Sequence, residues 1–258
     1  MADLLEYLVE ARLAGDVATT RESNYEHARA FAAGVEAFQF GLPPRGDWSF
    51  RRVLALMAER VGIDPDVHRS TGADVIDPQC TLDALERMRD RLRLAIDQRE
   101  RILLGSGHPA GVLDVHLALA AGLRGAGCEL LTAAVGQRFT VEWAALGKGD
   151  RLQIRFVGGV GVCAERGAAL WHSHSPRAME LMLADLSERD EPWPTLVIGD
   201  HGFAGAAAAA GIDVLCFADC NDPALFVGEA EGRVSVTVPI DDNVQPHLYG
   251  PVSAFLLS

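Results

Sequence analysis

The C-terminal part of the chain alternates short apolar runs with helix-forming segments, and this alternation constrains the fold more than any other feature. The runs lie at residues 102–105, 129–133, 195–199, 214–218 and 234–238. Strands that alternate with helices are joined by right-handed crossovers, which place helices over both faces of a sheet. We therefore expect a Rossmann-like α/β catalytic domain over residues 101–258, with a mostly parallel sheet covered by helices on both faces.

Residues 1–100 follow a helical period instead. Apolar residues recur three and four positions apart in residues 4–13 and 53–61. Thr81 is a suitable N-cap for a third helix that continues to Ile96. The sequence thus predicts an α-helical N-terminal region that precedes the α/β domain.

Residues 136–165 break the alternation. Two apolar runs punctuated by glycine, at residues 141–146 and 152–157, are typical of an inserted β-hairpin. The glycine-rich run at residues 158–161 is not followed by a lysine, a serine or a helix signal, so we interpret it as a turn.

The chain has 23 basic and 36 acidic residues, which gives a formal net charge of −13. This balance argues against nucleic-acid binding, which needs clustered positive charge. No apolar run reaches the roughly 18–20 residues of a membrane helix, and the N-terminus carries acids where a secretory signal carries positive charge. The five cysteines lack the paired spacing of a zinc knuckle or a redox dithiol. We expect a cytoplasmic protein with buried free thiols and a small-molecule partner, which can also form a homo-oligomer.

Polar residues directly after the apolar runs carry the functional information, because ligands bind beyond the carboxyl ends of the strands in an open α/β sheet. Histidines and aspartates are dense in five such tips, at residues 105–109, 171–176, 199–202, 218–223 and 239–243. Each tip alone can be a turn or a helix cap. Together, their potential metal ligands and acid–base groups indicate an enzyme.

The tips offer ligands for a divalent cation. Asp200 and Asp219 directly follow two of the runs, where a carboxylate is either a turn former or a ligand. His172 and His174 are two residues apart, so on an extended strand they share a face and can bind one ion. Alternatively, one of these histidines is a capping or core residue. Carboxylates combined with imidazoles favour Mg²⁺ or Mn²⁺ over a thiolate zinc site.

Other residues can bind the phosphoryl group of a substrate. Ser106, Gly107 and His108 lie in a Gly-Ser-Gly-His-Pro segment, whose glycines let the backbone approach an anion. The alternative is a tight turn between a strand and a helix. Asn221 is a further candidate, and Arg21 can hold a phosphate in bidentate fashion or belong to a helix-capping loop.

The candidates for proton transfer are His201, Asp222 and His108. A neighbouring histidine or aspartate can orient an attacking water or protonate a leaving alkoxide. Asp222 precedes Pro223, however, and this pair is also a good helix N-cap followed by proline at the first helical position.

Several long strings resemble, in the same order, an actinobacterial family of similar length whose members are described as phosphatases. They lie at residues 15–19, 107–116, 170–176, 200–205, 217–226 and 238–243. The likeness spans almost the whole chain and departs at residues 136–165. The order of a helical part and an α/β part is more distantly similar to the metal-dependent damage-control phosphatases, whose Asp-Asn pair is absent at Gly107 and His108.

The resemblance implies hydrolysis of a phosphomonoester. We expect a metal-dependent phosphoric monoester hydrolase that acts on a small phosphorylated metabolite, such as a sugar phosphate or a nucleotide. The chain lacks the P-loop, the Gly-x-Ser-x-Gly elbow and the Asp-x-Asp-x-Thr phosphatase motif. The residues leave two alternatives open: a sugar-phosphate isomerase or lyase with a histidine base, and a non-catalytic metabolite-binding protein.

Overall fold

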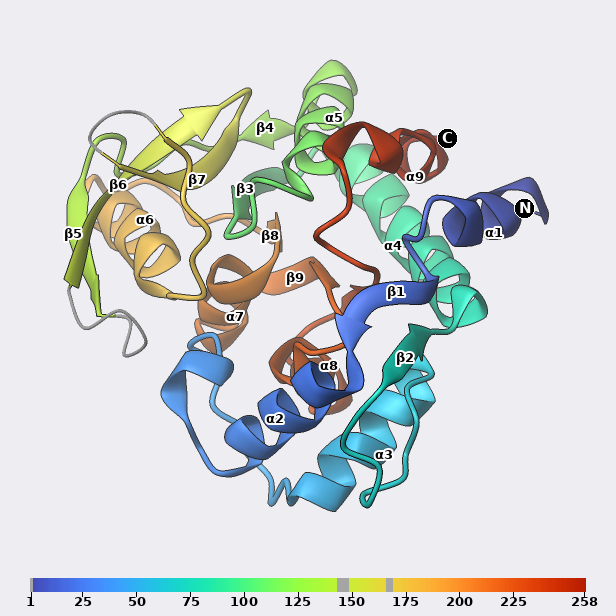
Figure 1. The fold of residues 1–258 in the computed structure, drawn as a ribbon. Coiled ribbons are helices and arrows are strands. Elements are labelled where there is room, and N and C mark those ends of the chain that lie inside the picture. Colours follow the sequence, from blue (N-terminus) through green and yellow to red (C-terminus); the bar gives the residue numbers. More distant parts are fainter. Residues whose placement is uncertain (1, 143–148, 166–168) are drawn as a thin grey trace.

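A central sheet organises the computed structural model, which describes residues 2–142, 149–165 and 169–258. Its strands are β3 (Arg101–Ser106), β4 (Glu129–Leu130), β5 (Arg138–Glu142), β6 (Gly149–Val157), β7 (Val160–Ala164), β8 (Leu196–Gly199), β9 (Asp213–Ala218) and β10 (Val236–Pro239). They form an eight-stranded sheet in the order β10-β9-β8-β3-β7-β6-β5, with β4 beside β3 (Figure 1). The predicted α/β class is confirmed.

The sheet is mixed, which corrects the prediction of a mostly parallel sheet. Pairing is parallel from β10 through β9, β8 and β3 to β7, and also between β3 and β4. It is antiparallel from β7 through β6 to β5. The β6–β7 turn contains Gly158 and Gly159, both with positive φ, which a tight two-residue hairpin turn requires. Strands β5 to β7 occupy the segment expected to hold a hairpin, and most of its first apolar run lies outside the described residues.

Helices cover both faces of the sheet. The helices are α1 (Ala2–Glu10), α2 (Arg21–Ala32), α3 (Phe50–Val61), α4 (Pro78–Gln98), α5 (Leu113–Gly125), α6 (Arg177–Glu188), α7 (His201–Ala209), α8 (Pro223–Ala230) and α9 (Gly250–Leu256), with 3₁₀ turns at Glu36–Phe38 and Pro246–Tyr249. Helices α4, α5 and α9 pack together on one face, and α6, α7 and α8 on the other (Figure 1). Among the described helices, none combines the length and the apolar character needed to cross a membrane.

The N-terminal region is mixed rather than purely helical, which corrects the second part of the fold prediction. Strands β1 (Gly15–Thr20) and β2 (Ala73–Ile76) form a separate antiparallel pair. Side chains alternate between half-buried and exposed along β1, so its apolar content is too low to stand out in the sequence. The start predicted for the third helix was also wrong: Asp77 caps α4 and accepts from the Gln79 N–H, while Thr81 is buried inside the helix.

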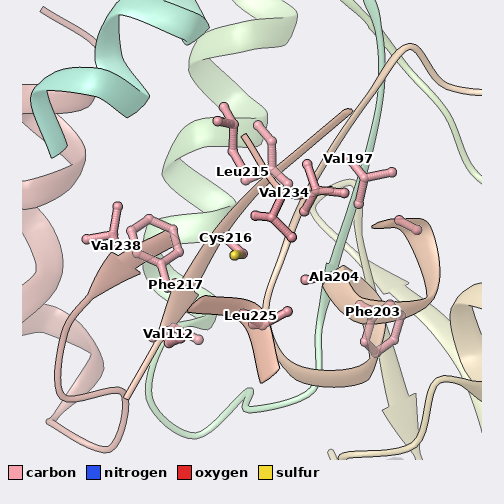
Figure 2. Close-up of a cluster of buried hydrophobic side chains, with 14 of the residues drawn as sticks. Val112, Val197, Phe203, Ala204, Leu215, Cys216, Phe217, Leu225, Val234 and Val238 are labelled. Atoms are coloured by element: carbon pink, nitrogen blue, oxygen red, sulfur yellow. The ribbon is translucent and has the colours of Figure 1, made fainter. Parts of the chain in front are cut away.

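One core cluster runs through both parts of the chain and includes Leu8 and Phe31 as well as the strands. Figure 2 shows its centre, where Leu215 and Phe217 of β9 lie among side chains from the neighbouring strands and helices. Burial of each such large side chain contributes about 1.5–3 kcal/mol. Cys216 lies in this cluster as a free thiol whose pKa is raised by burial. A thiol held in this way acts as a small apolar side chain.

Candidate active site

Five loops at the carboxyl ends of parallel strands meet at one edge of the sheet. They follow β3, β7, β8, β9 and β10. The chain passes from β7 to β8 across β3, so the strand order reverses there, and ligands of open α/β sheets bind at such a switch point. The side chains gathered at this edge, which we call the His–Asp cluster, are His108, His172, His174, His201, Asp200, Asp219, Asp222, Asp241 and Asp242.

Asp200, the first residue after β8, connects the β8 loop to the β3 loop. It is fully buried, and its Oδ1 accepts from the N–H groups of Gly107 at 2.6 Å and His108 at 3.1 Å. Added atoms at Gly107 would meet the Ser173 carbonyl oxygen at 2.5 Å, so only glycine lets these loops close. The two N–H groups expected to bind a phosphoryl group therefore already have an acceptor within the protein. Ser106 is likewise buried, and its hydroxyl accepts from the His108 N–H.

His201 lies at the centre of the cluster. Its Nδ1 is 3.0 Å from Asp200 Oδ1, and because a carboxylate only accepts, this nitrogen carries the proton. The opposite nitrogen, Nε2, faces Asp222 Oδ2 at 3.4 Å and Asp242 Oδ2 at 3.6 Å. His201 also has a φ of 43°, and such backbone strain persists only where the surroundings impose it. The imidazole is thus held with Nε2 aimed at two carboxylates.

Electrostatics around His201 are strong. Burial alone would lower the pKa of its imidazole, but the charges of Asp222, Asp200 and Asp242 raise it to about 10. Burial raises the pKa of Asp222 to about 7, against the opposing effect of His201. Buried titratable groups with pKa values shifted this far are typical of functional sites.

Four imidazoles, including that of His201, form two stacked pairs. The rings of His108 and His172 stack at 4.2 Å, and those of His174 and His201 at 4.7 Å. The Nε2 atoms of His172 and His174 are 3.1 Å apart, which joins the pairs. The buried Phe40 contacts His174 and His201 edge-on. Burial and the nearby charges of His201 and His108 lower the pKa of His172 to about 4, so its imidazole is neutral at pH 7.

Three further carboxylates complete the cluster. Asp219 accepts from the Cys220 N–H at 2.6 Å and from the Thr19 hydroxyl. Asp241 accepts from the N–H groups of Asn243 at 3.0 Å and Ala18 at 3.2 Å. Strand β1 thus reaches across from the N-terminal region to hold two aspartates at the sheet edge.

Asp242 is the third of these carboxylates and is only 4% exposed. Its Oδ1 lies 3.1 Å from His108 Nδ1. Its Oδ2 is buried without a hydrogen-bond partner among the described residues. A buried carboxylate oxygen without a donor is costly, which is a reason to look for a bound cation there.

Comparison with known proteins agrees with the character of this site. The family model described as Phosphatase matches residues 1–258. The chain belongs to the Phosphatase family. A curated relative named Phosphatase SCO2771, from Streptomyces coelicolor, is 47% identical over 259 residues, which cover 100% of this chain and 95% of that protein. No solved structure matches the chain significantly. The predicted family is confirmed, and the protein is a phosphatase, a hydrolase of phosphate esters.

Among the residues that the structure describes, three sets of side chains can each hold a metal ion, with ligand atoms that lie within 4.8 Å of one another. The sets are His108, His172 and His201; His201, Asp222 and Asp242; and Asp219, Asp241 and Asp242. Two of the metal ligands expected from the sequence, His172 and Asp219, belong to these sets. The other two, Asp200 and His174, lie in the cluster outside them and contact His201.

The remaining predicted residues lie in and beside the cluster. Asn221 follows Asp219 and Cys220 in the loop after β9, and its side chain donates to the Ser23 hydroxyl at 2.9 Å. Its carbonyl oxygen lies 2.9 Å from His27 Nδ1. These contacts connect the β9 loop to helix α2.

Arg21 has a structural role in the phosphatase. Its guanidinium is fully buried, and its three nitrogens donate to the carbonyl oxygens of Asp64, Asp66 and Arg69. One of them also pairs with Asp74 at 3.1 Å. The alternative of a substrate-binding arginine is therefore not supported, because the donors already serve the loop before β2.

Asp241 and Asp242 were not predicted as site residues, although both lie in the tip after the last apolar run. The signal for them was present as two adjacent aspartates. Phe40 and Thr19 carried no such signal, because only the fold brings them to the cluster.

Proposed function

We propose that the protein is a metal-dependent phosphomonoesterase. Its substrate is a small phosphorylated metabolite, such as a sugar phosphate or a nucleotide, which it hydrolyses in the cytoplasm. The observation that carries this proposal is His201, whose Nε2 faces Asp222 and Asp242 while its Nδ1 is held by Asp200. A histidine held by a carboxylate on one nitrogen is the usual form of an oriented metal ligand.

The residues present fit a divalent cation such as Mg²⁺ or Mn²⁺. Three buried aspartates, Asp200, Asp222 and Asp242, face His201, and a phosphoryl group would bring further negative charge to them. The Oδ2 atom of Asp242, which has no hydrogen-bond partner among the described residues, offers a direct ligand atom. Oxygen-rich donor sets with imidazole suit these cations. When bound, such an ion neutralises phosphoryl charge and lowers the pKa of a water ligand.

We assign the ligand role to His201, Asp222 and Asp242. Asp200 then acts as a positioning residue, because it holds the His201 tautomer and the turn at residues 107–108. His174 supports His201 by stacking on its ring.

His172 is the exposed histidine of the cluster and is placed to handle protons. Its low pKa leaves the ring neutral, so it can take the proton that water releases on attacking phosphorus. The water oxygen forms the new bond to phosphorus, the ester P–O bond breaks, and the leaving alkoxide takes up a proton. Burial alone would lower the pKa of His108, but Asp242 raises it overall, so His108 is the better proton donor.

The test is release of inorganic phosphate from a panel of sugar phosphates and nucleotides. Chelator-treated protein is assayed alone and after addition of Mg²⁺ or Mn²⁺, with the product mass recorded. We expect metal-dependent phosphate release that Asp222→Asn abolishes, while the exposed Asp90→Asn leaves it unchanged. A product of unchanged mass would support an isomerase instead. Binding of a phosphorylated metabolite without turnover would support a metabolite-binding protein. Phosphate release that is the same with and without chelator treatment would refute the metal dependence.

A further inference from the structure

A set of three carboxylates stands beside the proposed His201 site. Asp219, Asp241 and Asp242 are 2–4% exposed, and one oxygen from each lies within 4.8 Å of the others. Three acids at this spacing need a compensating charge.

We propose that Asp219, Asp241 and Asp242 form a second cation site, so that the phosphatase holds two divalent cations with Asp242 shared between them. This inference rests on the proposed function, which requires only the site at His201. The shared residue follows from the geometry, because Asp242 belongs both to the all-aspartate set and to the set with His201 and Asp222.

The state of Asp242 is the second observation in favour of this site. Its side chain is nine-tenths buried or more, and its Oδ2 has no hydrogen-bond partner among the described residues. With Oδ1 beside His108 and Oδ2 near His201, its two oxygens point to different parts of the cluster. A carboxylate in this position can bridge two ions.

Strand β1 donates hydrogen bonds to the other two carboxylates. The Thr19 hydroxyl donates to Asp219, and the Ala18 N–H donates to Asp241 at 3.2 Å. Outer contacts of this kind fix the direction of metal ligands, and their loss commonly weakens metal binding by about 10–100-fold. The role of the N-terminal strand is therefore to orient the all-aspartate site.

The two sites have different chemistry. The all-aspartate set offers only oxygen ligands and suits a hard cation, whereas the neighbouring set includes an imidazole. Paired cations in phosphatases stabilise the attacking and the leaving oxygen of an in-line displacement. A second ion also explains how a phosphoryl group can approach so many buried acids.

The experiment is a Mn²⁺ titration of the chelator-treated full-length protein, followed by electron paramagnetic resonance of free and bound Mn²⁺. We expect two bound Mn²⁺ per chain and a spin-coupled signal from the pair. Asp241→Asn and, separately, Asp219→Asn should each bind one Mn²⁺ at the concentration that gives two in the unmodified protein, and each should lose the coupled signal. Asp90→Asn, an exposed aspartate on α4, is the matched control and should bind two.

The outcomes separate this inference from the proposed function. One Mn²⁺ at saturation in the unmodified protein, with phosphate release still dependent on Mn²⁺, refutes the second site alone. Two coupled ions in both Asp variants refute the assignment to these residues. Phosphate release that does not respond to Mn²⁺ overturns the proposed function itself. Circular dichroism checks folding, and the titration of the unmodified protein decides the stoichiometry even if a variant does not fold.

Discussion

Replacing Gly111 by alanine should disturb the site without touching any of its side chains. Gly111 lies before helix α5, against the backbone of Asp242. A Cβ at this position would overlap the Asp242 carbonyl oxygen and lie 2.7 Å from its carbonyl carbon and 3.3 Å from Asn243 Cα, where ordinary contacts begin at 3.4 Å. The backbone of residues 242–243 must therefore move.

The size of the effect follows from this overlap. Overpacking of a closed site typically costs about 1–3 kcal/mol of unfolding free energy. A shift of about 1 Å in a positioned group can cost about 100-fold in rate. We expect Gly111→Ala to lower kcat/KM by about 100-fold and to weaken Mn²⁺ binding, because Asp242 moves with its backbone.

Gly125→Ala is the matched control, since nothing lies within 4 Å of a Cβ added at that end of α5. Alanine in a helix is favoured over glycine by about 0.5–1 kcal/mol, so this variant should be slightly more stable and fully active. Urea unfolding gives the stability, and phosphate release with added Mn²⁺ gives the activity. Gly111→Ala with the kcat/KM and stability of the control would refute the role given to this backbone contact.

Three other changes test separate parts of the structure. Arg21→Met should lower the unfolding free energy by about 3–5 kcal/mol, because the buried carboxylate of Asp74 loses its cationic partner. The kcat/KM of the folded enzyme should stay nearly unchanged. A raised KM at full stability would contradict this structural role. Asp200→Asn should lower kcat by at least about 100-fold with little change in KM, because His201 loses the carboxylate that holds its tautomer. An unchanged kcat would contradict the positioning role of Asp200. Burial alone would raise the pKa of Glu231, but hydrogen-bond donors from residues 45–48 lower it overall. The ionised Glu231 therefore stabilises the folded protein above about pH 4.3, and this stabilisation is lost as the pH falls through the folded-state pKa. Urea melts from pH 7 to 3 should show a smaller loss in Glu231→Gln than in the unmodified protein, and equal losses would exclude this role.

The sequence was informative wherever local pattern decides the structure. The apolar runs near residues 102, 196 and 214 became strands β3, β8 and β9 because continuous apolar residues suit strands buried on both faces. Since parallel strands end at the same edge, the tips after them had to meet, and Asp200 and Asp219 were located in this way.

Local sequence patterns did not predict the contacts between distant parts of the chain. Ala18 and Asp241 are 223 residues apart, so nothing local indicates that strand β1 supports a carboxylate of the site. Arg21 presents the same difficulty, because its partners lie in a loop more than 40 residues away. A polar residue beside a helix looks the same in sequence whether it binds substrate or anchors a loop.

The most direct test of the proposed metal site is anomalous diffraction from a crystal grown with Mn²⁺ and inorganic phosphate. We expect an anomalous peak bound by His201 Nε2 and oxygens of Asp222 and Asp242, with the phosphate in contact with the Mn²⁺ and His172 beside the phosphate. Mn²⁺ bound elsewhere while these three side chains contact only each other, or phosphate bound away from the His–Asp cluster, would contradict it.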